Sequence, residues 1–527
     1  MKLTDIKAEI SPLWAEKGYQ MPRFDIEAVR EKTKEEPVWV HFGAGNLFRA
    51  FPAAVLQQVL DTGKHDRGVI VAEGFDFEII DKAYRPYDNL SLLVCLQSDG
   101  NIRKKVIASV TESLKADARF KEDWMRLAEI FCSPGLQMVS FTITEKGYSV
   151  STDDLGRGLD PVLVMGKVTL LLYERFLAGA LPLTLQSMDN CSHNGDRVKA
   201  AVLAYASRWE DEGLVPPEFL AYLQDSGKVS YPWSMIDKIT PRPDGKVQKL
   251  LEEDGFEDHC SITTDKHTYT APFVNAEETE YLVVEDHYPN GRPPLELGGV
   301  LYVDRETVDK VERMKVCTCL NPLHTAMSLY GCLLGYDLIS AEMEDEDIRG
   351  LVTKLGYKEA MPVVVDPGVL KPDVFIDAVL NRRLPNPFMP DAPQRIATDT
   401  SQKLPIRFGE TIRAYRDRGL DTDDLVLIPL VLAGYARYLR GIDDEGRVFE
   451  PSPDPLLAEL RAIVAPLEVR EGKQDFSCLK TLYSRQDVFG ADLYGAGLGE
   501  RIEKMAAELF AGPGAVRRTL HKYVSAR

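Results

Sequence analysis

The ten residues KVCTCLNPLH, from Lys315 to His324, bring together an amine, two thiols, an amide and an imidazole. Thiols and imidazoles bind metal ions, and Cys317, Cys319, His324 and Cys332 form the pattern C-x-C-x4-H-x7-C. That pattern matches no common zinc spacing, and residues two apart on a helix point to opposite sides. We therefore expect no metal ion here, and we expect the eight cysteines of the chain to be reduced thiols that are mostly buried.

The same stretch has the residue types for acid–base chemistry. Glu312 and Lys315 are three residues apart and share a helix face, as do Asn321 and His324. Pro322 breaks the helix and pushes Asn321 out of the α conformation, which can turn the lysine amine and the asparagine amide toward one pocket. A partly desolvated lysine acts as a general base at neutral pH, and an amide stabilises a developing alkoxide. Glu312 favours the charged lysine, so we expect it to relay a proton. A surface ion pair beside a helix break remains the alternative.

A second candidate site follows a short apolar run near the N-terminus. The run VWVHF, residues 38–42, stops at GAGN and passes into LFRAFPAAVLQQVL, which has helical periodicity. Gly43 and Gly45 allow the close backbone approach that a pyrophosphate needs. Phe48 stands where the pattern G-x-G-x-x-G requires its third glycine. An ordinary strand, turn and helix is the alternative to a dinucleotide site.

Four polar residues around this turn are candidates for cofactor binding. We expect Asn46 to cap the helix and Arg49 to reach a phosphate. The next apolar run, GVIVAEGFD, ends in Glu73 and Asp76, where the second strand of a βαβ unit holds a ribose. Both carboxylates would repel a 2'-phosphate, which favours NAD over NADP. A solvated strand end is the alternative for either acid.

Apolar runs and helical patterns alternate through the first half of the chain, with further strands expected near residues 90–96, 136–144 and 181–188. This alternation predicts an α/β fold with a mostly parallel, doubly wound, Rossmann-like sheet. Longer helical patterns dominate from about Glu296 onward. We therefore expect a dinucleotide-binding domain over residues 1–295 and a mostly α-helical substrate-binding and catalytic domain over residues 296–527.

Composition and charge exclude several classes of protein. The 527 residues exceed what a single compact core holds, which agrees with two domains. The formal net charge of −19 opposes binding to the phosphates of a nucleic acid. The N-terminus has no apolar signal segment and the chain has no run of about 18 apolar residues. We expect a cytoplasmic protein that does not enter a membrane.

Six segments, taken in order from about Val38 to Arg407, resemble the polyol-specific long-chain dehydrogenases, the family of mannitol dehydrogenase and fructuronate or tagaturonate reductase. FGAGNLFRAF resembles the cofactor loop of that family, in which an aromatic residue or histidine normally replaces the third glycine. In EYLVVEDHYPNGRP, Tyr281 stands where the family has tryptophan. The other four segments are TITEKGY, SMDNCSHNG, YPWSMIDKITP and RIATDTSQK.

The resemblance implies a catalytic site without metal. Lys315 would be the base, Asn190 and Asn321 would hold the substrate oxygen, and His324 would orient the substrate. The family usually has four residues between this lysine and asparagine, whereas this chain has five. We expect a π-bulge to absorb the extra residue and restore the direction of the lysine. The resemblance also places four residues near the substrate or the proton relay: Glu145, Asp237, Arg395 and Lys403.

The function implied by the resemblance is hydride transfer between NAD and a secondary alcohol or ketone of a small sugar acid or polyol. The segments GNLFRAF and LHTAM look most like those of the uronate reductases. The expected substrate is therefore a hexuronate such as fructuronate, which gives mannonate, and a polyol such as mannitol or arabinitol is the alternative. A catalytically silent nucleotide-binding protein and a metal-dependent dehydrogenase are the other readings.

Overall fold

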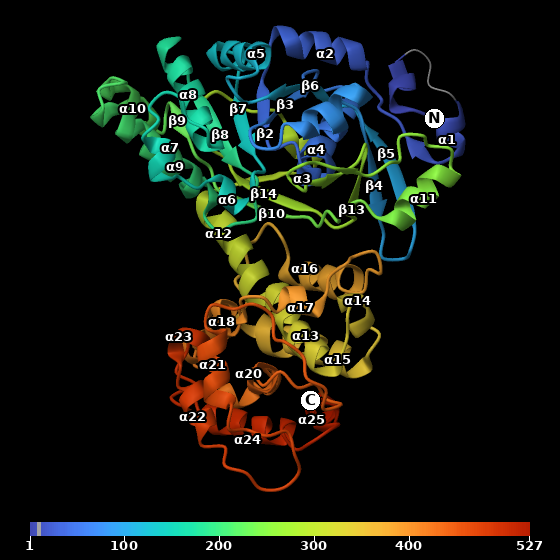
Figure 1. Cartoon of the computed structure of the whole chain (residues 1–527), viewed down its shortest axis with the longest axis vertical. Coiled ribbons are helices and arrows are strands. Elements are labelled where there is room, and N and C mark those ends of the chain that lie inside the picture. Colours follow the sequence, from blue (N-terminus) through green and yellow to red (C-terminus); the bar gives the residue numbers. More distant parts are fainter. Residues whose placement is uncertain (8–11, 527) are drawn as a thin grey trace. The chain divides into compact units, whose positions relative to one another are not determined.

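The computed structural model describes residues 1–7 and 12–526, and the chain divides into two compact units (Figure 1). Unit 1 comprises residues 1–97 and 101–309, and unit 2 comprises residues 98–100 and 310–527. The division falls inside helix α12 (Arg305–Met314), later than the change of sequence pattern near residue 296. Unit 1 is α/β and unit 2 is mostly helical, which confirms the predicted fold class.

Six parallel strands form the main sheet of unit 1, in the order β6-β3-β2-β7-β8-β9. The chain adds β3 and β6 on one side of β2, and then β7, β8 and β9 on the other. The order therefore reverses between β2 and β7, the switch point at which sheets of this kind bind ligands. The strands are β2 (Trp39–Phe42), β3 (Val69–Glu73), β6 (Val110–Lys115), β7 (Met138–Phe141), β8 (Leu183–Ser187) and β9 (Val229–Ser230).

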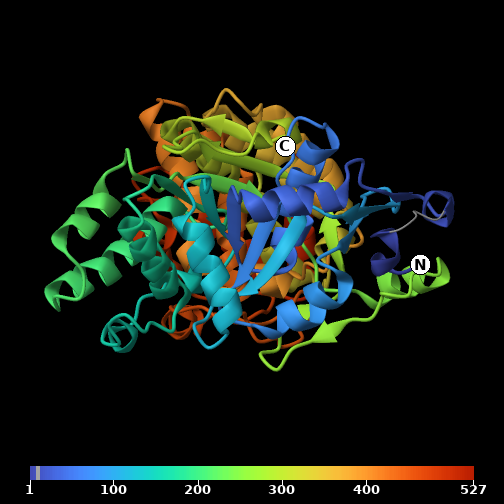
Figure 2. The same ribbon diagram turned by 90° about the horizontal axis from the view of Figure 1, so that it is seen from above.

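Alternate side chains of these strands enter two separate hydrophobic cores. Val40 and Phe42 of β2 pack with α5, α8 and α9, whereas Trp39 packs with α2, α3 and α4. The sheet is therefore covered by helices on both faces, which confirms the doubly wound arrangement; its blue and cyan strands lie side by side in Figure 2. These helices are α2 (Ile26–Glu35), α3 (Asn46–Ala50), α4 (Pro52–Asp61), α5 (Lys121–Cys132), α8 (Val164–Leu177) and α9 (Asn194–Asp211).

One predicted strand belongs to a different sheet. The run near residues 90–96 forms β4 (Ser91–Leu96), which pairs antiparallel with β5 (Ile102–Ile107) rather than joining the parallel sheet. The short connection between the two strands explains this, because only an antiparallel pair can be joined so directly. With β1 (Tyr19–Gln20) and β13 (Phe273–Glu277), they form a sheet in the order β1-β5-β4-β13. A third sheet contains β10 (Ser234–Asp237), β14 (Tyr281–Glu285) and β15 (Leu301–Val303).

Unit 2 is built around two long, buried helices. α13 (Asn321–Leu334) packs against α20 (Leu427–Leu439), whose residues are all buried, and α20 packs against α24 (Gly499–Leu509). Several helices contain π-helical turns, which widen the helix by one residue. Those near the candidate site are η5 (Lys315–Cys319), η8 (Val379–Arg383) and η9 (Pro405–Gly409).

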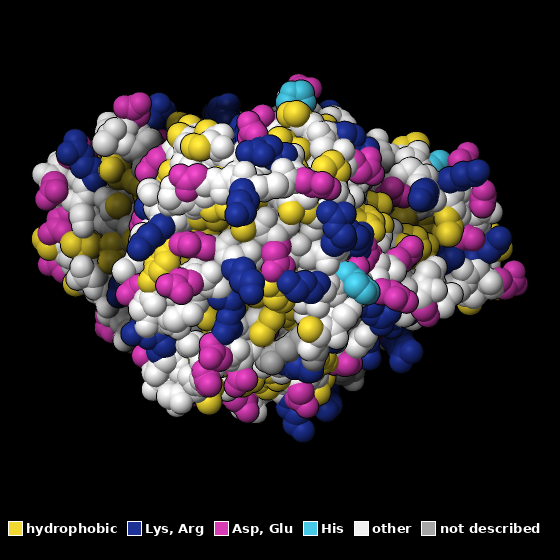
Figure 3. All heavy atoms as spheres, turned by 90° about the horizontal axis from the view of Figure 1, so that it is seen from below, with side chains coloured by type: hydrophobic (Ala, Val, Ile, Leu, Met, Phe, Trp, Pro, Cys, Tyr) yellow, Lys and Arg dark blue, Asp and Glu magenta, His cyan; other side chains and the backbone are white. Residues whose placement is uncertain are grey.

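Surface charge is mixed on the face shown in Figure 3, where Lys and Arg side chains lie among Asp and Glu side chains. A surface that binds nucleic acid gathers its cations into a patch or stripe. Among the described residues, no such stripe of cations is seen on this face. Over the part of the chain that the structure describes, no helix has both the length and the apolar character needed to cross a bilayer.

Candidate active site

Gly43 and Gly45 follow the central strand β2 and differ in what surrounds them. Gly43 has φ +107°, and a Cβ atom there would lie 2.2 Å from the carbonyl oxygen of Thr142, just after β7. Only glycine therefore fits where these two neighbouring strands end. A Cβ atom on Gly45 would meet no heavy atom within 4 Å. The backbone at Gly45 thus faces open space at the switch point, which is the room that a pyrophosphate needs.

The structure corrects the expected role of Asn46 and shows contacts of Arg49 within the protein. Asn46 is the first residue of α3 rather than its cap, and its amide oxygen accepts a hydrogen bond from Arg49 at 2.9 Å. The Arg49 side chain is 1% exposed and donates to the Ala271 carbonyl (2.6 Å) and the Thr270 hydroxyl (2.7 Å). Its guanidinium therefore ties α3 to the 270–271 segment, a structural role that was not predicted, and the binding of a phosphate by Arg49 stays a prediction.

The two acids after β3 are bound by groups of the protein itself. The Glu73 carboxylate accepts hydrogen bonds from the N–H groups of Ala44 (2.9 Å), Phe75 (2.8 Å) and Asp76 (3.0 Å). Burial raises the pKa of Glu73, and these hydrogen bonds lower it in part. The Asp76 carboxylate accepts from Thr268 and from Thr264, each at 2.6 Å. Glu73 thus joins the turns after β2 and β3, which brings both acids close to the glycine turn.

Asn190 lies in an exposed bend between β8 and α9, and Asp189 fixes one end of that bend. The Asp189 carboxylate accepts hydrogen bonds from the N–H groups of Ile143 (2.9 Å) and Thr144 (3.0 Å) and from the Tyr148 hydroxyl (2.6 Å). The segments SMDNCSHNG and TITEKGY therefore meet at the carboxyl ends of β8 and β7. Asp189 and Tyr148 position Asn190, and the sequence analysis did not single them out.

Asn194 fixes the other end of the bend, since its amide exchanges hydrogen bonds with Ser234 of β10. Asp237, at the end of the same strand, is buried. Glu145 is different, because its side chain is 63% exposed and forms an ion pair with Arg197 at 2.8 Å. Unit 1 therefore brings Asn190 and Asp237 onto connected segments, whereas Glu145 lies on its surface.

In unit 2, the π-bulge expected between Lys315 and Asn321 is present. Turn η5 begins at Lys315, and the N–H of Leu320 donates to the Lys315 carbonyl at 3.1 Å, a bond spanning five residues. The Lys315 side chain is buried, and Glu312 lies one helical turn before it in α12. The helix break itself falls at Leu320, with φ −129° and ψ −62°, and not at Asn321 as predicted. Asn321 begins α13, because Pro322 is tolerated in the first turn of a helix.

His324 lies one turn further along α13 and is mostly buried. Its Nε2 atom is 3.9 Å from Oδ2 of Asp391. Burial lowers the pKa of His324 to about 4, against the opposing effect of Asp391, and the cations of Arg407, Arg383 and Arg395 add to the lowering. The imidazole is therefore neutral at physiological pH and can both donate and accept a hydrogen bond.

The two predicted substrate-binding cations, Arg395 and Lys403, lie near His324. Arg395, in α17 (Pro393–Ile396), forms an ion pair with Asp391. The Lys403 amine, in α18 (Thr400–Leu404), donates to the carbonyls of Ile396 and Thr398. Burial and the neighbouring cation of Arg407 together lower the pKa of Lys403 to about 8. His324 and both cations therefore share one region of unit 2.

The cysteines do not form a metal site with these residues. All eight are free thiols, and only Cys319 and Cys332 are fully buried, fewer than predicted. Burial raises the pKa of the Cys317 thiol to about 11, so this residue stays protonated. Within residues 1–7 and 12–526, no cluster of three or more His, Cys, Asp or Glu side chains has the geometry to hold a metal ion.

Comparison with known families identifies the fold and its two units. Residues 38–297 match the model of the mannitol dehydrogenase Rossmann domain, and residues 307–509 match that of the mannitol dehydrogenase C-terminal domain. The chain belongs to the mannitol dehydrogenase family. It is therefore an oxidoreductase, and the resemblance seen in its six segments is confirmed.

Individual relatives cover almost the whole chain. A D-mannonate oxidoreductase of Thermotoga maritima is 50% identical over an alignment of 525 residues that covers 97% of each chain. Two solved structures share the fold: D-sorbitol dehydrogenase (TM-score 0.79, 24% identity, 99% of this chain and 100% of that one) and Pseudomonas fluorescens mannitol 2-dehydrogenase with NAD and D-mannitol (TM-score 0.71, 23% identity, 100% of both).

Two charged residues near His324 were not predicted from the sequence. Asp391 and Arg407 both lie beside His324, and neither was singled out from the sequence. Asp391 lies in the loop before α17, and Arg407 lies in the π-helical turn η9. The α-helical spacing of four residues therefore does not apply to either residue, and no local pattern marks them.

Proposed function

We propose that this protein is an NAD-dependent D-mannonate oxidoreductase, which interconverts the ketone of fructuronate and the secondary alcohol of mannonate. The observation that carries this proposal is the 50% identity to the Thermotoga maritima D-mannonate oxidoreductase along 97% of both chains. The cationic region around His324 supports it, because a sugar acid brings a negative charge. The polyol alternative has no such charge to match.

Lys315 acts as the general base in this proposal. Its amine takes the hydroxyl proton when the alcohol is oxidised and returns it to the ketone oxygen in the reverse direction. Its buried position at the start of η5 keeps the amine away from bulk water. Glu312 precedes it by one helical turn and relays the proton to solvent. The nicotinamide, when bound, exchanges a hydride with the carbon that carries this oxygen.

The asparagines and the histidine bind and orient the substrate. The amides of Asn190 and Asn321 donate hydrogen bonds to the substrate oxygen and stabilise its charge as the proton moves. The neutral imidazole of His324 hydrogen-bonds a neighbouring hydroxyl. In the same proposal, Lys403 and Arg395 bind further oxygens of the substrate, with Asp237 and Glu145 as the remaining polar contacts.

NAD is the cofactor that the residues of unit 1 fit best. The open space before the Gly45 backbone accommodates a pyrophosphate, and the fixed turn at Gly43 holds that backbone in place. Glu73 and Asp76 lie where the ribose would bind, and their carboxylates disfavour the extra phosphate of NADP. A solved member of the fold, mannitol 2-dehydrogenase, holds NAD.

A substrate panel tests this function. The purified protein is mixed with NADH or NADPH and with fructuronate, tagaturonate, fructose or xylulose, and loss of the reduced-nicotinamide absorbance is followed. We expect the highest kcat/KM with fructuronate and NADH. A higher kcat/KM with fructose or xylulose would replace the uronate by a polyol, and no turnover with any pair, despite NADH binding, would contradict the proposed reaction.

A further inference from the structure

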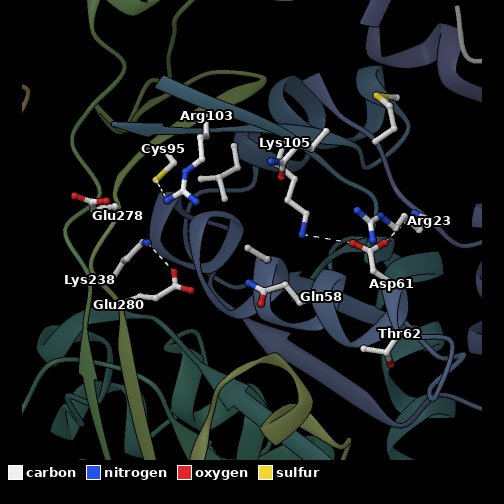
Figure 4. Close-up of a pocket in the computed structure, with 14 residues that line it drawn as sticks. Arg23, Gln58, Asp61, Thr62, Cys95, Arg103, Lys105, Lys238, Glu278 and Glu280 are labelled. Carbon is white, nitrogen blue, oxygen red and sulfur yellow. Dashed lines mark hydrogen bonds and ion pairs between the residues drawn. The ribbon is translucent and has the colours of Figure 1, made fainter. Parts of the chain in front are cut away.

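Four of the charged groups that line one cavity of this protein form two ion pairs. Unit 1 has a cavity of about 650 Å³ beside α4, shown in Figure 4. Within it, Lys105 lies 3.5 Å from Asp61 and Lys238 lies 2.7 Å from Glu280. Within each of these two pairs, the positive and the negative charge neutralise one another. Arg407 in unit 2 differs from these paired residues.

Arg407 is a largely buried cation without a counter-ion in the part of the chain that the structure describes. It lies in the π-helical turn η9, and its Nη1 atom donates to the hydroxyl of Thr325, the residue after His324. That hydroxyl carries no charge, and no hydrogen bond to a described residue uses the Nε or Nη2 atom of Arg407. Burial lowers the pKa of Arg407 to about 10, so it remains charged at neutral pH.

The neighbouring cations are already bound by the protein. Arg395 is paired with Asp391, and the Lys403 amine is held by two main-chain carbonyls. Arg407 is close enough to both His324 and Lys403 for its charge to lower the pKa of each. It therefore lies next to two residues proposed to contact the substrate. A buried guanidinium without a counter-ion is unfavourable, because it has lost its hydration without gaining an opposite charge.

A planar carboxylate is the group that best fits such a guanidinium. Arginine presents parallel N–H donors that match the two oxygens of a carboxylate, and the free Nε and Nη2 atoms form one such edge. A hydroxyl of a neutral polyol accepts only one of these bonds and brings no charge. A ligand that carries a carboxylate would therefore pair with this guanidinium better than a neutral one.

We propose that Arg407 binds the carboxylate of the sugar acid and sets the preference of this enzyme for acids over neutral polyols. This inference rests on the proposed function and extends it, since it assigns the residue that recognises the acid group. Thr325 holds the guanidinium in place, and Lys403 supplies a second positive charge nearby.

The test compares Arg407→Gln with Arg416→Gln, which removes an exposed arginine from the same unit. The kcat/KM of each variant is measured with fructuronate and with fructose, a neutral ketose, using NADH. We expect Arg407→Gln to lower kcat/KM about 100-fold for fructuronate, mainly through KM, and less than about threefold for fructose. Arg416→Gln should match the wild type with both. Arg407→Lys, which keeps the charge, should recover part of the loss.

Two further readouts separate binding from folding. D-mannonate should raise the melting temperature of the wild type and of Arg416→Gln but not of Arg407→Gln. Arg407 helps to lower the pKa of Lys403 to about 8, so we expect KM to rise above that pH as Lys403 loses its proton. In Arg407→Gln, this rise in KM should move to higher pH.

Equal losses on fructuronate and fructose, or a change of less than threefold on fructuronate, would overturn the role of Arg407. The proposed function fails separately, if the wild type neither reduces a hexuronate nor binds D-mannonate.

Discussion

Glu342 is a carboxylic acid held in unit 2 without a hydrogen-bond partner. It ends α14 (Ile339–Glu342), its side chain is fully buried, and neither carboxylate oxygen has a hydrogen-bond partner among residues 1–7 and 12–526. Burial, together with the charge of Asp345, raises its pKa well above the usual range. The folded protein therefore keeps a proton that the unfolded chain releases, so this residue lowers stability increasingly as the pH rises above about 4.

We predict that Glu342→Gln is more stable than the wild type at pH 8 and that the difference is smaller at pH 5. While the folded and unfolded states differ by one proton, the gap changes by about 1.4 kcal/mol per pH unit. Denaturant unfolding at the two pH values measures it. Glu344→Gln, at an exposed neighbour, is the control, and identical pH slopes for all three proteins would show that Glu342 is ionised when folded.

The types of residue in the sequence indicated which side chains could be catalytic, but not which residues they contact. Lys315 and His324 stood out because their types and spacing suit acid–base chemistry. Two partners of Arg49, in contrast, lie more than 200 residues away in the sequence, at Thr270 and Ala271. No local pattern contains such a contact, so the structural role of this cation beside the glycine turn could not be predicted.

At the scale of elements, the glycine turn after β2 has one glycine needed for the fold and one positioned for a ligand. We predict that Gly43→Ala destabilises the protein by at least about 2 kcal/mol, because of its positive φ and the contact with Thr142. Gly45→Ala should change stability by less than about 0.5 kcal/mol but weaken NADH binding at least tenfold. Thermal unfolding and NADH fluorescence titration measure both.

Each glycine variant is the control for the other. Normal NADH binding by a stable Gly45→Ala protein would mean that the cofactor does not approach this backbone. In that case, the loss of stability in Gly43→Ala would concern only the fold and not the cofactor.

The π-helical turn η5 is the element that makes this chain differ from the family spacing. If η5 only accommodates the extra residue, deleting Cys317 should convert η5 to an α-helical turn. The Lys315 side chain should then point in the same direction as before. We predict that the deletion keeps kcat within about tenfold of the wild type. Inserting one alanine after Cys317 should instead rotate Lys315 by about 100° relative to Asn321 and lower kcat at least 100-fold.

Cys317→Ala, which keeps the length, controls for the loss of the thiol. A folded deletion variant without activity would contradict the idea that the bulge preserves the direction of the lysine.

The π-helical turn was predictable because one extra residue lies between two pairs whose spacing is unchanged, Glu312 with Lys315 and Asn321 with His324. A π-helical turn is the simplest way for a helix to accommodate that residue. The position of the helix break was not, since Pro322 is compatible both with a break before it and with a helix start. Strand β4 was recognised as a strand, but its sheet was not, because pairing depends on the hairpin with β5 and on β13, which lies about 180 residues later.

At the scale of the whole molecule, sequence periodicity and composition predicted the α/β class and the change to a helical second half. Hydrophobic patterning sets such features locally along the chain, so they can be read without knowing the contacts. The cluster around His324 was beyond reach, because its charges come from α13, α17, α18, η8 and η9 and meet only in the folded unit.

The central claim is that this oxidoreductase uses Lys315 as its general base. Its most direct test is kcat for fructuronate reduction by Lys315→Ala and wild type with saturating NADH, with NADH binding measured by fluorescence. We predict a loss of at least about 1000-fold in kcat with unchanged NADH binding. A Lys315→Ala variant that turns over as fast as the wild type would contradict the lysine mechanism.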